Sequence, residues 1–157
     1  MTDLNFEDIV GRYFNLNLKK DNYRIYVEEA GQGTPLLCLH TAGSDGRQFR
    51  HILNDKRITN NYRVIVFDLP WHGKSNPPEG YELKDYKLTT NLYKEIIMSF
   101  CKQYKLIDPV IMGCSMGGRV VLHLALEHCD YFKAVIALEG SDKLEPYYDL
   151  DWLHRPD

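Results

Sequence analysis

A chain of 157 residues with 44% hydrophobic and 26% charged residues suits a single domain with a sizeable buried core. Its formal charge of −3 and isoelectric point near 6.1 argue against a nucleic-acid-binding surface. No apolar run reaches the length of a membrane span, and the first residues are acidic and polar, unlike a secretory leader. We therefore expect neither a nucleic-acid nor a membrane partner.

The four cysteines, Cys38, Cys101, Cys114 and Cys129, contain no C-x-x-C pair. Three of them lie in apolar stretches, which favours buried free thiols in a reducing cytoplasm over disulfides or zinc ligands. The sequence therefore predicts a cytoplasmic location and no metal or other cofactor.

The amino-terminal part of the chain predicts a short helical segment within residues 1–11, followed by a β-hairpin. Residues 13–18 and 23–28 each alternate between apolar and polar side chains, and residues 19–22 between them offer a turn. Two alternating runs joined by so short a turn indicate antiparallel strands.

From residue 36 onward, continuous apolar runs alternate with segments of helical period. The runs indicate strands covered on both faces, at residues 36–39, 63–67, 110–112 and 133–138. The helical patterns lie at about residues 48–53, 89–104 and 116–128. This order predicts an α/β fold: a mostly parallel, doubly wound sheet with an amino-terminal antiparallel hairpin. In such sheets the active site lies at the carboxyl ends of the strands.

The strand at residues 110–112 leads into Gly113-Cys114-Ser115-Met116-Gly117, a Gly-x-Ser-x-Gly pattern. A serine at the apex of a sharp strand-to-helix turn has an exposed hydroxyl, and glycines permit the tight backbone there. The Met116 N–H group opens the helix and can stabilise an oxyanion. The alternative is a glycine-rich connection with no chemical role, because glycine and serine are common in turns.

Three loops at the predicted strand ends together resemble those of the α/β-hydrolase superfamily, over nearly the whole chain. They are the His-Gly-like loop His40-Thr41-Ala42-Gly43, the loop Asp68-Leu69-Pro70-Trp71-His72-Gly73-Lys74-Ser75, and the nucleophile elbow Gly113-Cys114-Ser115-Met116-Gly117-Gly118. Within the superfamily, the sequence most resembles small-molecule esterases, enol-lactonases and meta-cleavage-product hydrolases. Two residues depart from the pattern: Thr41 and Trp71 stand where the superfamily usually has glycine.

The resemblance implies a role for each of several residues. Ser115 is the expected nucleophile, and the backbone N–H groups of Ala42 and Met116 are the expected oxyanion hole. Candidate substrate contacts are Thr41, Trp71 and Cys114; the alternative for Trp71 is that it only covers the end of the sheet. The same resemblance makes His40, His72 and Asp68 structural residues of their own loops.

A serine needs a base, and the superfamily order is nucleophile, acid, then histidine. Among the histidines that follow Ser115, His123 and His128 lie on the helix that leaves the elbow, so we expect them to be surface or packing residues. His154 is a weaker candidate for the base. Glu139 ends the strand after the elbow strand and is a possible acid, as in relatives of the haloalkane dehalogenases, whereas the commoner acid position lies one strand later.

The resemblance also implies that the fold continues beyond residue 157. Residues 1–142 would form the amino-terminal part of the hydrolase core, with the strand ending at Leu138 as the sixth of eight, and residues 143–157 would begin a lid or linker. A second polypeptide segment is then expected to complete the sheet and to supply the acid and the base.

Two functions from different classes fit the sequence. The first is a serine hydrolase acting on an ester, lactone or related carbonyl bond of a small molecule. The second is a non-catalytic ligand-binding or receptor module on the same fold, which keeps the serine pocket without turnover. A third reading, an inactive fragment, follows if the missing segment never joins the chain.

Overall fold

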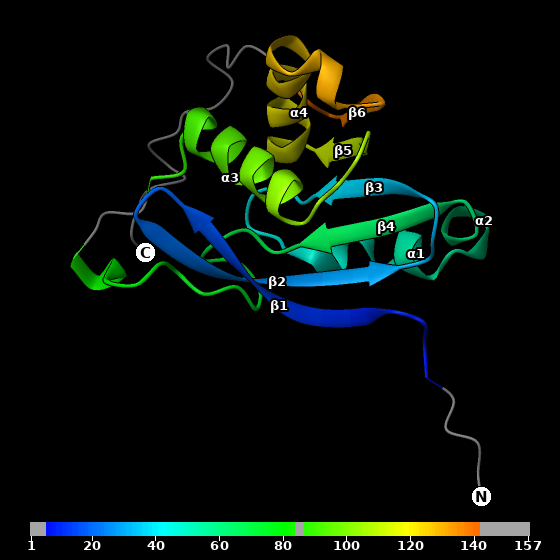
Figure 1. The fold of residues 1–157 in the computed structure, drawn as a ribbon, viewed down its shortest axis with the longest axis horizontal. Coiled ribbons are helices and arrows are strands. Elements are labelled where there is room, and N and C mark those ends of the chain that lie inside the picture. Colours follow the sequence, from blue (N-terminus) through cyan, green and yellow to red (C-terminus); the bar gives the residue numbers. More distant parts are fainter. Residues whose placement is uncertain (1–5, 84–86, 142–157) are drawn as a thin grey trace, which may run out of the picture.

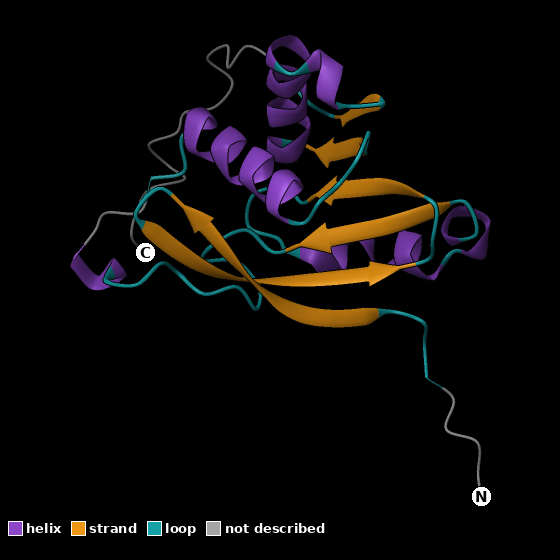
Figure 2. Cartoon of the chain, in the orientation of Figure 1, coloured by secondary structure: helices purple, strands orange, loops and turns teal. Residues whose placement is uncertain are grey.

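The computed structural model describes residues 6–83 and 87–141, which form one six-stranded mixed sheet with helices on both faces (Figures 1 and 2). The strand order across the sheet is β1-β2-β4-β3-β5-β6. The strands are β1 (Val10–Leu18), β2 (Asp21–Ala30), β3 (Thr34–Leu39), β4 (Tyr62–Phe67), β5 (Val110–Cys114) and β6 (Ala134–Leu138). The predicted α/β class is confirmed, as is an amino-terminal antiparallel hairpin followed by parallel strands.

Strands β1 and β2 form the predicted antiparallel hairpin, paired from Val10 opposite Glu29 to Leu18 opposite Asp21. Both strands are longer than the alternating runs, because pairing with β2 extends the ladder back to Val10. The predicted helix is therefore wrong for residues 6–11, where β1 begins and residues 6–9 are not helical; residues 1–5 lie outside the described part.

Strands β3, β4, β5 and β6 are parallel to one another, and β2 joins them by antiparallel pairing with β4. The helices are α1 (Arg50–Asn54), α2 (Lys56–Thr59), α3 (Thr90–Gln103) and α4 (Met116–Glu127), with short 3-10 turns η1 (Gly46–Phe49), η2 (Tyr81–Leu83) and η3 (Cys129–Tyr131). Parallel strands joined by these crossovers bring the loops after β3, β4, β5 and β6 to one edge of the sheet.

Helices α3 and α4 cover one face of the sheet, and α1 lies on the other (Figure 1). The first face buries Leu37, Ile65 and Ile111 completely. Helix α3 begins at Thr89, whose hydroxyl caps the helix by accepting the Leu92 N–H at 3.1 Å. Its inner face carries much of the predicted apolar stripe; the buried residues are Tyr93, Ile96, Ile97, Met98, Phe100 and Cys101.

Strand β6 differs from the other parallel strands because it is largely exposed. The prediction that it is covered on both faces is wrong for the described chain: Ile136 and Leu138 are 40% and 43% exposed. Helix α4 packs on one face, where Val135 contacts the core. Within the described residues, β6 pairs only with β5, and no helix covers the face of Ile136.

Candidate active site

Ser115 lies between β5 and α4 in a strained backbone conformation, with φ 52° and ψ −111°. Such a conformation costs a non-glycine residue about 1–3 kcal/mol and persists only where its surroundings hold it. Two hydrogen bonds hold it here: the Ser115 N–H donates to the Leu138 carbonyl at 2.8 Å, and the Ser115 carbonyl accepts from the Arg119 N–H at 2.8 Å. The predicted sharp turn is therefore present, with a partly exposed serine at its apex.

Glycines around Ser115 let the first turn of α4 pack directly on the sheet. A Cβ on Gly113 would lie 2.2 Å from the Gly117 carbonyl oxygen, and one on Gly117 would lie 2.5 Å from the Leu39 carbonyl oxygen. Real Cβ atoms do not approach backbone this closely, so larger residues cannot occupy these positions without shifting it. The contact with Leu39 places the start of α4 beside the end of β3, where the His40 loop begins.

Two backbone N–H groups at this junction are available to a ligand. Met116 is the first residue of α4, so its N–H has no acceptor within the helix. No hydrogen bond within the described part of the chain uses the Ala42 N–H, and Ala42 is exposed. These are the two donors expected from the sequence, and their role in holding an oxyanion stays a prediction.

His40 is fully buried and uses both ring nitrogens to join two loops. Its Nε2 atom accepts the Leu69 N–H at 3.1 Å, so the ring proton must lie on Nδ1, which donates to the Thr41 carbonyl at 2.8 Å. Burial lowers the pKa of His40 and keeps the ring neutral. This engagement agrees with a structural role and leaves neither nitrogen free to take a proton from Ser115.

Asp68 connects the loop after β4 to the loop after β3. One carboxylate oxygen accepts the Gly46 N–H at 2.7 Å and the other accepts the Lys74 N–H at 2.8 Å. The Ser75 hydroxyl closes the same loop by donating to the Asp68 carbonyl at 2.6 Å and accepting the Tyr26 N–H at 2.8 Å. Asp68 thus ties down loops, as the resemblance implied.

No histidine ring bonds the Ser115 hydroxyl within residues 6–83 and 87–141. His72 holds its own loop through Nδ1, 2.9 Å from the Pro70 carbonyl oxygen. His123 lies on α4 as predicted, whereas His128 lies just after the last helical residue, Glu127. Residue His154 falls outside the described part of the chain, as do residues 143–157 of the expected lid.

Glu139 follows the last residue of β6, at the same edge of the sheet as Ser115. It is exposed and has a left-handed backbone with φ 51°. Its place at the strand end is the predicted one, and its role as the acid stays a prediction. Cys114, the residue before Ser115, is partly exposed at the end of β5.

A cleft of about 700 Å³ lies over the loops after β3 and β4, and Ser115 is not among its lining residues, which are Gly43, Ser44, Asp45, Arg47, Trp71, His72 and Gly73. Trp71 has a left-handed backbone with φ 65°, and its ring meets Tyr81 edge-on at 6.3 Å between centroids. Position 71, where the superfamily usually has glycine, requires a positive φ. Tryptophan adopts this φ with backbone strain that glycine would not have. Thr41 has no positive φ, so its side chain is compatible with the loop backbone.

Sequence reasoning missed Asp45 and Gln48. Asp45 caps η1 by accepting the Arg47 N–H at 3.0 Å, and the Arg47 guanidinium bound to it lowers its pKa to about 2. An aspartate just before the helical segment is a recognised start signal that would have identified it. Gln48, whose Oε1 accepts the Thr41 N–H at 2.9 Å, carries no such signal because an exposed glutamine is typical of any helix surface.

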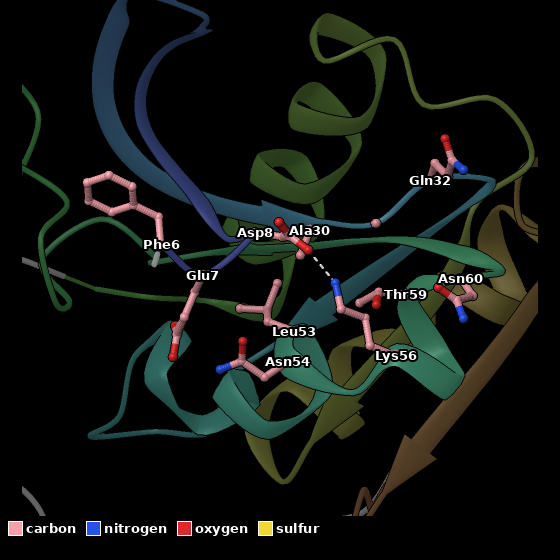
Figure 3. Close-up of a pocket in the computed structure, with 11 residues that line it drawn as sticks. Phe6, Glu7, Asp8, Ala30, Gln32, Leu53, Asn54, Lys56, Thr59 and Asn60 are labelled. Carbon is pink, nitrogen blue, oxygen red and sulfur yellow. Dashed lines mark hydrogen bonds and ion pairs between the residues drawn. The ribbon is translucent and has the colours of Figure 1, made fainter. Parts of the chain in front are cut away.

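A second cavity, of about 530 Å³, opens at the opposite edge of the sheet (Figure 3). It lies between the segment before β1 and helices α1 and α2, where Asp8 and Lys56 form an ion pair. The amino ends of β3 and β4 lie at this edge, so the cavity is remote from Ser115. Among the described residues, no group of three acidic, histidine or cysteine side chains is arranged to hold a metal ion, and no helix is long and apolar enough to cross a membrane.

A family model described as the alpha/beta hydrolase fold matches residues 34–156. Curated relatives include a pimeloyl-(acyl-carrier protein) methyl ester esterase of Vibrio vulnificus (strain YJ016), 27% identical over 119 residues, and a magnesium-chelatase 30 kDa subunit of Rhodobacter capsulatus, 33% identical over 95 residues. The matched part covers 76% of this chain and 42% of the esterase, and 60% of this chain and 31% of the chelatase subunit.

Solved structures agree with the fold. An epoxide hydrolase from Vigna radiata superposes with a TM-score of 0.67 at 21% identity, covering 82% of this chain and 39% of that one. A haloalkane dehalogenase from Agrobacterium tumefaciens C58 gives 0.64 at 21% identity, covering 80% and 40%. The chain therefore spans about two fifths of the length of the first esterase relatives and of these structures.

Proposed function

Because the chain belongs to the alpha/beta hydrolase family, we propose that it is the nucleophile-bearing part of a serine hydrolase that acts on an ester, lactone or related carbonyl bond of a small molecule. The observation that carries the proposal is Ser115 itself. Its strained backbone is held between β5 and α4, beside the end of β3 that leads to Ala42. Strain of this kind at a partly exposed serine favours a functional role over a plain connection.

In the proposed reaction, the Ser115 hydroxyl oxygen attacks the substrate carbonyl carbon while a base takes the hydroxyl proton. The carbonyl oxygen becomes an oxyanion, and the N–H groups of Ala42 and Met116 stabilise it. Collapse of this intermediate breaks the bond to the leaving group, which takes the proton and departs, leaving an acyl ester on Ser115. Water then hydrolyses that ester by the same steps and regenerates the serine.

The serine nucleophile favours carbonyl substrates over the substrates named for the two solved relatives. Attack of a serine oxygen on an epoxide or a haloalkane would produce an ether, which water does not readily cleave. Attack on a carbonyl produces an ester, which an oxyanion hole and a base can hydrolyse. The name of the Vibrio relatives, a methyl ester esterase, describes a bond of this class.

The acid and base of this mechanism come, in our proposal, from a second segment outside residues 1–157. Within the described residues, His40 and His72 are bonded to loop backbone, and no histidine ring bonds Ser115. Strand β6 is exposed at Ile136 and Leu138 and has a free outer edge in this part of the chain. An open apolar edge is a surface that a further strand would cover. Glu139, at the end of β6, is the alternative source of the acid.

Hydrolysis of p-nitrophenyl butyrate by the complete polypeptide tests the proposal. Ser115→Ala should lower kcat by about 10³-fold or more because it removes the nucleophile, with an unchanged circular dichroism spectrum. Ser99→Ala, on α3, is the matched control and should keep wild-type turnover. Wild-type turnover by Ser115→Ala would refute the assignment.

A second candidate function is a non-catalytic ligand-binding module on the same fold, favoured by a cleft whose lining does not include Ser115. In that alternative, the cleft at Trp71 binds a small ligand without turnover. A complete polypeptide that binds a carbonyl ligand but neither hydrolyses esters nor depends on Ser115 would favour this alternative.

A further inference from the structure

We propose that Gln48 is a positioning residue of the oxyanion hole, an inference that rests on the proposed role of the Ala42 N–H group. The observation is a pair of hydrogen bonds on either side of one residue. The Thr41 N–H donates to Gln48 Oε1 at 2.9 Å, and the Thr41 carbonyl accepts the His40 Nδ1–H at 2.8 Å.

These two bonds fix two successive peptide planes. The Thr41 carbonyl and the Ala42 N–H belong to one planar trans peptide, so they point in opposite directions. By holding the carbonyl, His40 therefore constrains the direction of the Ala42 N–H. Gln48 holds the preceding plane, which contains the Thr41 N–H, so both backbone dihedrals of Thr41 are constrained.

Gln48 can do this because its own turn is anchored. The Gly46 N–H is bound by Asp68 at 2.7 Å, and the Gln48 N–H donates to the Asp45 carbonyl at 3.1 Å. Asp45 is itself fixed to Arg47 through both carboxylate oxygens. Turn η1 thus extends from the Asp68 anchor, and the Gln48 side chain returns from it to the loop after β3.

The Gln48 bond also decides which donor remains for a ligand. With its hydrogen bonded to Gln48, the Thr41 N–H is not available to an oxyanion, whereas the Ala42 N–H has no partner in the described part of the chain. Thr41 is partly exposed and Gln48 is exposed, so without the bond the Thr41 N–H would turn toward water. The peptide that carries the Ala42 N–H would then be held only by the bond between His40 and the Thr41 carbonyl.

The test uses Gln48→Leu in the complete polypeptide, with p-nitrophenyl butyrate as substrate and a trifluoromethyl ketone as transition-state analogue. Loss of an oxyanion donor costs roughly 10²–10³ in kcat, and a donor that is only misdirected should cost less, on the order of 10-fold. We expect kcat to fall by about that factor with KM within about 2-fold, and the inhibition constant of the ketone to rise in proportion. Gln32→Leu, at the opposite edge of the sheet, is the control and should change none of these.

A purely structural glutamine would lower the melting temperature without changing kcat or ketone affinity, and that result would overturn the inference. Gln48→Asn, which retracts the oxygen by one methylene, gives the same test if the leucine variant fails to fold. Amide exchange of Thr41 provides a readout without activity: it should be slow in the wild type and fast in both variants. If Ser115→Ala keeps activity, the proposed function itself fails; if Ser115→Ala is inactive and the Gln48 variants match the wild type, only this inference fails.

Discussion

The two halves of the candidate site differ in how their polar groups are used. On the β3 and β4 side, His40, Asp68 and Ser75 are 0%, 5% and 9% exposed, and each bonds to loop backbone. On the β5 and β6 side, Ser115 is partly exposed, and its hydroxyl has no hydrogen bond within the described residues. Polar groups that are buried and fully bonded build the site, whereas those left open are the ones a substrate can meet.

The difference extends to the sheet. Strands β3 and β4 are buried along most of their length, but β6 exposes four of its five residues. One side of the site thus has rigid loops on a covered sheet, while the other has a strained serine beside an uncovered strand. The rigid side can hold the Ala42 donor in place, and the open side is where a further segment could deliver the base.

The largest expected effect is a loss of stability when a methyl group is added at Gly113, in the nucleophile elbow. In Gly113→Ala the Cβ would lie 2.2 Å from the Gly117 carbonyl oxygen, so α4 must shift on the sheet. We expect a loss of about 3 kcal/mol or more in the free energy of unfolding, measured by urea denaturation. Gly80→Ala is the contrast: its φ of 73° adds a backbone cost that Gly113 does not have, but nothing lies within 4 Å of its Cβ, so the loss should be only about 1 kcal/mol. Equal losses in the two variants would show that the elbow is not tightly packed.

The next effect concerns the buried ring of His40. Burial lowers its pKa in the folded protein, whereas the unfolded chain takes up the proton near the ordinary value of about 6.5. The unfolded state therefore binds more protons just below that value, and the contribution of His40 to stability falls as the pH drops, until the folded ring is protonated too. Protonation would also place a hydrogen on Nε2 against the Leu69 N–H. His72, Asp68 and Asp45 are the charged or titratable groups around the ring.

Nitrogen-15 NMR of the His40 ring checks this prediction directly. The neutral Nδ1–H form should persist below pH 6.5, and urea denaturation should show lower stability at pH 5.5 than at pH 7.5. A His40 ring that titrates above pH 6.5, or that carries its proton on Nε2 when neutral, would contradict the locked arrangement of the β3 and β4 side.

The smallest expected effect is a difference in stability between alanine and glycine variants at Trp71 and Thr41, the two positions where the superfamily usually has glycine. Trp71→Gly and Trp71→Ala both remove the indole, so their difference in stability reports the backbone alone. Since φ at position 71 is 65°, the glycine variant should be more stable by about 1 kcal/mol. At Thr41, whose φ is not positive, alanine should be at least as stable as glycine. If glycine were the more stable variant at both positions, or alanine at both, the proposed difference in backbone conformation between positions 41 and 71 would be wrong.

The sequence predicted the sheet, its hairpin and the elbow because each has a strong local signal. Alternation marks the hairpin, continuous apolar runs mark β3, β4 and β5, and the glycine spacing around Ser115 marks a turn. The exposure of β6 could not be read in this way. Its apolar run is typical of a strand covered on both faces, whereas the described residues, in a chain that spans about two fifths of its relatives' length, include no element that covers the face of Ile136.

The finer parts of the site were harder to predict for a related reason. The bond between Gln48 and Thr41 joins two residues whose types are ordinary in loops and helices, so the pattern contains nothing to indicate it. The positive φ of Trp71 was not predicted, because tryptophan itself does not favour that conformation. Local propensity finds elements, while these contacts depend on how distant segments meet.

The most direct test of the central claim is covalent labelling of Ser115. A fluorophosphonate should react with the complete polypeptide, as the serine oxygen attacks phosphorus and fluoride leaves, and peptide mass spectrometry should place one adduct on Ser115. Ser115→Ala should not be labelled, and Ser99→Ala should react like the wild type. A folded, complete polypeptide that resists the reagent, or that is labelled equally in Ser115→Ala, would contradict the claim that Ser115 is an activated nucleophile.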